Sequence, residues 1–96
     1  MSDTRRDIDE VSVPRLRRGV RLKHDTVRGQ WILLGPERIF ELDAIAVEIV
    51  KRIDGDRDLS AIVDELADLY NAERNQIMAD VREFLEGLAE RRAIET

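Results

Sequence analysis

The sequence predicts an α+β domain in which a three-stranded antiparallel sheet is followed by three helices. Residues 20–42 contain three short apolar runs separated by turn residues, which is the pattern of a small sheet. Residues 43–91 then contain three apolar stripes at helical spacing. A chain of 96 residues has room for one modest core. We therefore expect residues 14–96 to form a single domain, preceded by a flexible tail over residues 1–13.

Each predicted strand has its own signal. Val20 to Lys23 alternates apolar and charged residues at period two, as a half-buried strand does. Gln30 to Leu34 follows a polar turn and is more continuously apolar, which favours the central position in the sheet. Gly35 and Pro36 provide the next turn, and the third strand is expected at residues 39–42. Its outer edge is then free to receive another strand.

The first two helices are predicted to begin at aspartate caps. Asp43 and Asp58 each precede an apolar stripe, and a carboxylate at this position accepts N–H groups of the first turn. Gly55 is suited to the left-handed position that ends the first helix. The stripes comprise Ala46, Ile49, Val50 and Ile53 in the first helix, and Leu59, Ile62, Val63, Leu66, Leu69 and Tyr70 in the second.

The third helix is the longest, at about residues 74–91, and follows a break in the pattern over residues 71–75. Ala93 and Ile94 are expected to close back on the sheet. A short turn joins the second and third helices as in a helix-turn-helix, so three strands followed by three helices predict a winged-helix-like domain. The buried stripe of the third helix comprises Ile77, Val81, Phe84, Leu85 and Leu88.

Composition bears on where the protein works. Residues 1–13 are mostly charged or polar, and their few apolar side chains cannot offset the entropy of ordering. They lack the apolar segment of a secretion signal, and no apolar run in the chain exceeds four residues. Cysteine is absent, so the chain needs no oxidising compartment. We expect a cytoplasmic protein that does not bind a membrane.

The residue inventory argues against catalysis. His24 is the only histidine, and beside Asp25 it is expected to be a surface or structural residue. The carboxylates fall mostly on polar helix faces, and no phosphate-binding loop or metal-ligand spacing occurs. We therefore expect a protein that is not an enzyme and that holds no metal or cofactor.

DNA binding, or another protein-interaction role, is the alternative that a winged-helix-like domain suggests. Between Glu73 and Arg92 the third helix carries five acidic residues against four arginines, so it would neutralise phosphates poorly. We expect no nucleic-acid partner. The basic stretch of Arg15, Arg17, Arg18, Arg21 and Lys23 is either a wing contact or, more simply, a solvated strand face.

Peptide binding explains more of the pattern. The apolar third strand beside the long helix would form a groove for an added strand, with main-chain hydrogen bonds on one wall and side-chain contacts on the other. Most of the apolar anchors must also serve the core, so only a minority are expected to reach a ligand. The anchors are Ile39, Phe40 and Leu42 on the strand, and Ile77, Val81, Phe84 and Leu85 on the helix.

Six short motifs occur in order between residues 13 and 94. They are Pro14-x-Leu16-x-x-Gly19-x-Arg21-Leu22, Leu33-Leu34-x-Pro36-Glu37, Leu42-Asp43-x-x-Ala46, Asp54-Gly55, Leu66-x-x-x-Tyr70 and Asp80-Val81-x-x-Phe84-Leu85-x-x-Leu88. Each motif is weak alone, but the ordered set resembles the PqqD family. The charged extension before Val13 lies outside the resemblance.

The resemblance implies a non-catalytic peptide chaperone, a recognition element for ribosomally made and modified peptides (RiPPs). Members of that family hold the precursor peptide of pyrroloquinoline quinone (PQQ), PqqA, as an extra strand. They present it to the radical-SAM enzyme PqqE, which cross-links a Glu and a Tyr of the peptide. Arg15, Arg18 and Arg21 would complement acidic residues of either the peptide or the enzyme. The peptide-binding residues carried over to this sequence are Arg38, Ile39, Phe40, Glu41, Leu42, Ile77, Asp80, Val81, Phe84 and Leu85.

Overall fold

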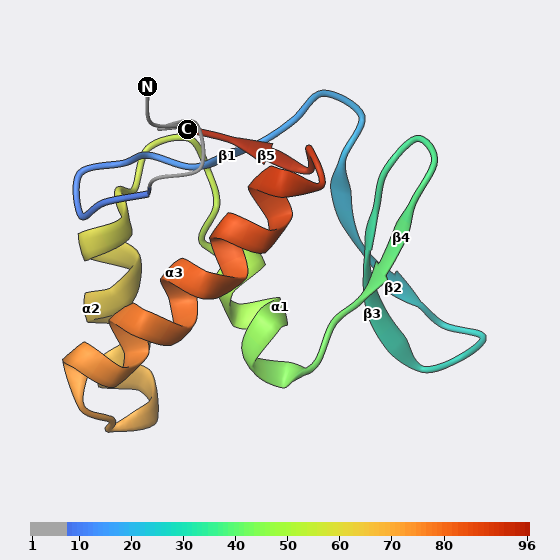
Figure 1. Cartoon of the computed structure of the whole chain (residues 1–96). Helices are drawn as coiled ribbons and strands as arrows, with labels where there is room; N and C mark the ends of the chain where they lie inside the picture. The colour runs from blue at the N-terminus through green and yellow to red at the C-terminus, as the bar shows by residue number, and fades with distance from the viewer. Residues whose placement is uncertain (1–7) are drawn as a thin grey trace.

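The computed structural model describes residues 8–96, and its sheet and helices follow the predicted order. Strands β2, β3 and β4 form an antiparallel sheet in that order, so the α+β class and the central position of the second predicted strand are confirmed. Figure 1 shows the three helices grouped beside this sheet, with α1 leading on from β4. The elements are β1 (Arg15–Leu16), β2 (Arg21–Asp25), β3 (Gln30–Leu34), β4 (Ile39–Glu41), α1 (Ala44–Lys51), α2 (Leu59–Tyr70), α3 (Arg74–Glu90) and β5 (Ile94–Glu95).

The sheet turns one face toward the core because side chains alternate along its strands. Leu22, Leu33 and Phe40 are cross-strand neighbours, and Leu33 is fully buried in the core. In the next row Lys23 and Glu41 are exposed, whereas Ile32 between them is 8% exposed. The sheet therefore has one core face and one largely solvated face.

Both predicted aspartate caps are confirmed. Asp43 accepts a hydrogen bond from the N–H of Ala46 at 2.8 Å, and Asp58 accepts one from Ala61 at the same distance. Gly55 has a positive φ of 79°, but α1 already ends at its C-cap, Arg52. Gly55 is left-handed as predicted, but the prediction that it ends the helix is wrong. It lies three residues beyond the C-cap, in the loop between α1 and α2.

The core lies between the helices and β3, and it ends before the last turn of α2. Leu66 is 1% exposed, whereas Leu69 and Tyr70, which were expected to be buried, are exposed. This last turn extends past the buried cluster and places its apolar side chains in solvent. Among residues 8–96, no helix has the length and apolar character needed to cross a membrane.

The end of the chain does not return to the three-stranded sheet as predicted. Instead, β5 pairs with β1 in a separate antiparallel ribbon, with Ile94 opposite Leu16. The N–H of Arg17 also donates to the C=O of Ala93 at 3.0 Å. Ala93 and Ile94 are each 2% exposed. They close the core at the end of α3, where residues 15–17 supply the backbone partners (Figure 1).

The expectation of a flexible segment before residue 14 is wrong for residues 8–13. Ile8 is 4% exposed and belongs to the core cluster. The C=O groups of Glu10 and Ser12 accept hydrogen bonds from the N–H groups of Ser60 and Leu59, at 3.0 and 2.8 Å. These N–H groups lie in the first turn of α2, which has no intrahelical partner for them. Residues 1–7 lie outside the described residues.

Candidate functional site

β4 is an edge strand, and its pairing with β3 shows which of its backbone groups are free. The N–H of Gly35 donates to the C=O of Arg38 at 2.9 Å, and the N–H of Leu42 donates to the C=O of Trp31 at 3.1 Å. In an antiparallel pair, the residues whose backbone groups face the partner strand alternate along the strand. The backbone groups of residues 38, 40 and 42 therefore face β3.

The backbone groups of Ile39 and Glu41 consequently face away from β3. Within residues 8–96, no other strand pairs with β4, and neither residue makes a further backbone hydrogen bond. The two N–H and two C=O groups of these residues form an open ladder edge. An extended peptide can add to such an edge as a fourth strand.

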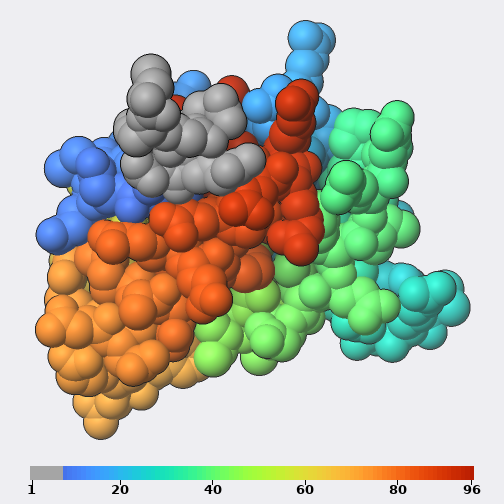
Figure 2. Space-filling view, in the orientation of Figure 1, coloured from blue at the N-terminus to red at the C-terminus, as the bar shows by residue number. Residues whose placement is uncertain are grey.

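A hollow lies where the β3–β4 turn approaches the end of α3. Its volume is about 340 Å³. Phe40 and Val20 contribute apolar surface, and Arg92 contributes from just beyond α3. Figure 2 shows the red end of α3 beside the green surface of the β3–β4 hairpin. The complete lining comprises Val20, Gly35, Pro36, Glu37, Arg38, Phe40, Arg91, Arg92 and Ala93.

The end of α3 is shaped by a left-handed residue that is not glycine. Arg92 has φ of 62°. The N–H of Arg92 donates to the C=O of Ala89 at 3.0 Å, and the N–H of Ala93 donates to the C=O of Leu88 at 2.9 Å. These two bonds form a Schellman motif, in which glycine is the usual left-handed residue. The motif turns the chain so that residues 91–93 line the hollow.

The predicted site residues on β4 are divided between surface and core. Arg38, Ile39 and Glu41 are exposed, and Ile39 retains 62% of its accessible surface. Phe40 is half-buried and lines the hollow. Leu42 is 6% exposed and packs in the core. Four of the five therefore have surface available to a ligand, and Leu42 supports the strand from beneath.

The predicted residues on α3 divide in the same way. Val81 and Leu85 are 1% and 0% exposed, so they belong to the core. Ile77 and Phe84 are half-buried against that core. Asp80 is exposed and accepts a hydrogen bond from Nε2 of Gln76 at 3.1 Å. None of these five residues lines the hollow, which lies at the other end of α3.

The three predicted basic partner residues lie before and at the start of β2. Arg15, Arg18 and Arg21 are all exposed, and none of them forms an ion pair within residues 8–96. His24 is exposed as expected, with its ring centroid 4.9 Å from that of Trp31. Residues 8–96 contain no group of three possible His, Cys, Asp or Glu metal ligands.

Sequence reasoning missed the contribution of Val20, Arg91 and Arg92. The two arginines follow the last apolar residue of the α3 stripe, so periodicity assigns them only to the end of a helix. Val20 was expected as part of a strand, with no indication that it borders the turn after β3. The loops that carry Gly19 and Pro36 lie close together, since a Cβ atom at position 19 would be 3.4 Å from Cγ of Pro36.

Known proteins resemble this chain over most of its length. The family model described as coenzyme PQQ synthesis protein D (PqqD) matches residues 30–94. A PqqA binding protein of Xanthomonas euvesicatoria pv. vesicatoria is 49% identical over 87 residues, which cover 91% of this chain and 95% of that protein. A PqqA binding protein of Rhizobium meliloti is 48% identical over 88 residues, covering 92% of this chain and 90% of that protein.

Two solved structures are also similar. One is the solution NMR structure of the PqqD truncation of Methylobacterium extorquens PqqCD, which is described as a functional, stand-alone RiPP recognition element. It is 41% identical, covers 98% of this chain and 100% of that chain, and has a TM-score of 0.84. The crystal structure of PqqD from Xanthomonas campestris is 44% identical, covers 90% and 96% of the two chains, and has a TM-score of 0.57. From the family match, the identities and the shared fold, we conclude that this chain belongs to the PqqD family.

Proposed function

We propose that this protein binds the precursor peptide PqqA by adding it as a strand to the outer edge of β4. The observation that carries the proposal is the open backbone of Ile39 and Glu41, whose N–H and C=O groups have no strand partner within residues 8–96. The relatives named PqqA binding protein support the choice of peptide. The RiPP recognition element with the same fold supports the type of function.

Backbone pairing alone is too weak for useful affinity. Four added hydrogen bonds contribute about 0.5 to 1.5 kcal/mol each, whereas micromolar binding requires roughly 8 kcal/mol. Side-chain contacts must therefore supply the remainder. Ile39, Phe40, Ile77 and Phe84 retain exposed or half-exposed apolar surface on β4 and α3. The buried residues Leu42, Val81 and Leu85 hold these two elements in place, and the direct contacts fall to their neighbours.

In this proposal the protein performs no chemistry and presents PqqA to the radical-SAM enzyme PqqE. A strand held on β4 is ordered along its bound residues, while the rest of the peptide extends from the domain. When this protein docks on PqqE with PqqA bound, the effective concentration of the peptide at the enzyme rises. The exposed residues Arg15, Arg18 and Arg21 remain candidates for contact with the peptide or with the enzyme.

Peptide backbone methylation tests strand addition directly. A set of synthetic PqqA peptides, each N-methylated at one residue, is titrated into the protein by calorimetry. A methyl group removes one N–H donor, so affinity should fall at alternate residues of the bound segment. Amide hydrogen exchange of the complex should show new protection at Ile39 and Glu41. Loss of affinity without alternation, or unchanged exchange at both amides, would contradict strand addition.

A second experiment tests the choice of partner. Unmodified PqqA should bind at micromolar concentration or below, whereas a scrambled peptide of the same composition and a random DNA duplex should not. Addition of this protein should raise the turnover of PqqA by PqqE. It should have no such effect when the scrambled peptide replaces PqqA. If PqqA fails to bind, the proposed function is wrong. If PqqA binds and turnover is unchanged, only the presentation step is wrong.

A further inference from the structure

We propose that the hollow beside β4 receives an acidic side chain of the bound peptide, which the guanidinium groups of Arg38 and Arg92 hold. This inference rests on the proposed function and adds the chemistry by which the site selects its peptide. It assigns a ligand-binding role to Arg92, which neither the apolar pattern nor the edge of β4 indicates.

The charge of the hollow differs from that of the whole protein. The chain has a formal net charge of −5. The hollow is lined by three arginines, Arg38, Arg91 and Arg92, against one acidic residue, Glu37. A concave surface of one charge sign attracts ligands of the opposite sign. In an acidic protein this local excess of positive charge favours a carboxylate.

Two of the three guanidinium groups are available for such a ligand. Arg91 donates from Nη1 to the C=O of Gly87 at 3.2 Å, so it is partly committed to the end of α3. Arg38 and Arg92 make no ion pair or side-chain hydrogen bond with the described part of the chain, and both are exposed. A guanidinium group binds a carboxylate through two parallel N–H donors, which is stronger than a neutral hydrogen bond.

The backbone of Arg92 gives a second, independent observation. Its φ of 62° lies in the left-handed region, where a side chain costs stability and glycine does not. Strained residues of this kind occur at ligand-binding sites, where the side chain has a use that offsets the strain. Here the strained residue is also one that lines the hollow. The two observations together point to a role for the Arg92 side chain in binding.

The position of the hollow fits a peptide added to β4. Arg38 immediately precedes Ile39, the first residue of the strand, so a peptide paired with Ile39 and Glu41 passes the mouth of the hollow. Phe40 and Val20 provide apolar surface for the methylene groups of the ligand side chain. An acidic residue near that end of the added strand can therefore place its carboxylate between Arg38 and Arg92.

The variant Arg92→Gly separates binding from folding, because glycine suits the left-handed position. We expect a thermal midpoint equal to or above that of the parent protein. We also expect about a tenfold loss of affinity for synthetic PqqA in calorimetry, as for the loss of one charge-assisted hydrogen bond. Lys23→Gln is the matched control, since it removes one exposed charge from β2 outside the hollow. Its affinity should change less than twofold.

A peptide series identifies the group that binds. Each Glu and Asp of PqqA is replaced in turn by Gln or Asn, and a further peptide carries an amidated C-terminus. One of these altered peptides should bind the parent protein about tenfold more weakly than unaltered PqqA does. The same peptide and unaltered PqqA should bind Arg92→Gly with equal affinity, because the two changes remove the same contact. Amidation should leave the affinity unchanged.

The outcomes are distinguishable. If parent PqqA binds and no acidic replacement interacts with Arg92→Gly, the acidic-side-chain inference is overturned and the proposed function stands. The same holds if only C-terminal amidation weakens binding, or if Arg92→Gly and Lys23→Gln weaken it equally. If parent PqqA does not bind at all, the proposed function itself fails.

Discussion

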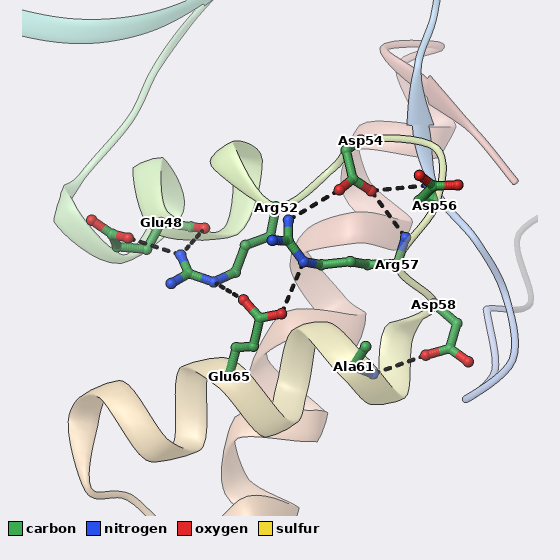
Figure 3. A network of polar contacts seen from close by, with 8 residues as sticks. All are labelled: Glu48, Arg52, Asp54, Asp56, Arg57, Asp58, Ala61 and Glu65. Carbon is green, nitrogen blue, oxygen red and sulfur yellow. Dashed lines mark hydrogen bonds and ion pairs between the residues drawn. The ribbon is translucent and has the colours of Figure 1, made fainter.

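The Nε atom of Arg52 lies 3.0 Å from Oε1 of Glu65, and this contact joins the end of α1 to the middle of α2. The other carboxylate oxygen of Glu65 lies 2.8 Å from Nε of Arg57, in the loop between the two helices. Arg52 also donates from Nη1 to Oε1 of Glu48 at 2.8 Å (Figure 3). The hydrogen bond to Glu48, together with that to Glu65, raises the pKa of Arg52. This network fixes α1, the helix that follows β4 directly.

The variant Arg52→Met should lower the free energy of unfolding by about 1 to 2 kcal/mol. The Arg52 side chain is only 19% exposed, and its loss removes the hydrogen-bonded partner of Glu48 and one of the two arginines that contact Glu65. Urea unfolding monitored by circular dichroism measures the change. Lys51→Met is the control, because the Lys51 side chain is 47% exposed and its Nζ atom lies 3.8 Å from Oε2 of Glu48. It should cost at most about 0.5 kcal/mol. Equal losses in the two variants would contradict the role assigned to Arg52.

The same network predicts a dependence of stability on pH. The hydrogen bond from Arg52 lowers the pKa of Glu48 below its ordinary value of 4.5, against the opposing effect of burial. A lowered pKa in the folded state stabilises the fold at pH values above the unfolded pKa, and this contribution disappears as the pH falls through the folded pKa. The difference in stability between the parent and Glu48→Gln should therefore shrink from about pH 6 to about pH 3.

The comparison with Glu48→Gln also isolates this carboxylate from its neighbour. The backbone N–H groups of Arg57 and Asp56 lower the pKa of Asp54, so the total stability falls in the same acidic range for a second reason. Asp54 is present in both proteins, so its contribution cancels when the free energy of unfolding of Glu48→Gln is subtracted from that of the parent. Thermal unfolding at a series of pH values is sufficient, and a difference that stays constant down to about pH 3 would contradict the prediction.

Residues 8–13 should contribute substantially to stability. Ile8→Ala removes a core side chain that is 4% exposed and should lower the free energy of unfolding by about 2 to 4 kcal/mol. Val11→Ala provides the control, since Val11 in the same segment is 75% exposed. Its effect should stay within about 0.5 kcal/mol. Chemical unfolding compares the two variants, and a small effect of Ile8→Ala would mean that the segment is not part of the cooperative fold.

The variant Phe40→Lys should weaken PqqA binding more than tenfold and retain the helical content. Phe40 lines the hollow and is half-buried, so a lysine can direct its ammonium group to solvent along the strand. It would then remove an apolar contact from the peptide site, and the added ammonium group would not replace that contact. Val27→Lys introduces the same charge in the β2–β3 turn, where Val27 is 93% exposed. If calorimetry shows that Phe40→Lys binds PqqA with unchanged affinity, Phe40 is not part of the site.

The sequence determined the features that depend on neighbouring residues. Period-two alternation located β2, a continuous apolar run after a polar turn located β3, and the carboxylates of Asp43 and Asp58 located the starts of α1 and α2. Both signals act within one turn or a few residues, so they can be interpreted without knowledge of distant partners. The edge of β4 was predictable for the same reason, because three successive hairpin strands place the last one at an edge.

Tertiary structure decided the features that depend on distant partners. The β1–β5 ribbon joins Leu16 to Ile94, and two strands of two residues each carry no periodic signal. The burial of Ile8 in the core likewise depends on distant residues, as do the backbone bonds of residues 10 and 12 to α2. At the candidate site, the stripe on α3 could not show that Val81 is buried while Phe84 is half-exposed, nor that Arg92 faces the turn after β3. Local patterns identify which side of an element is apolar, whereas only the packing of elements decides which apolar residues remain exposed and which charges meet across a hollow.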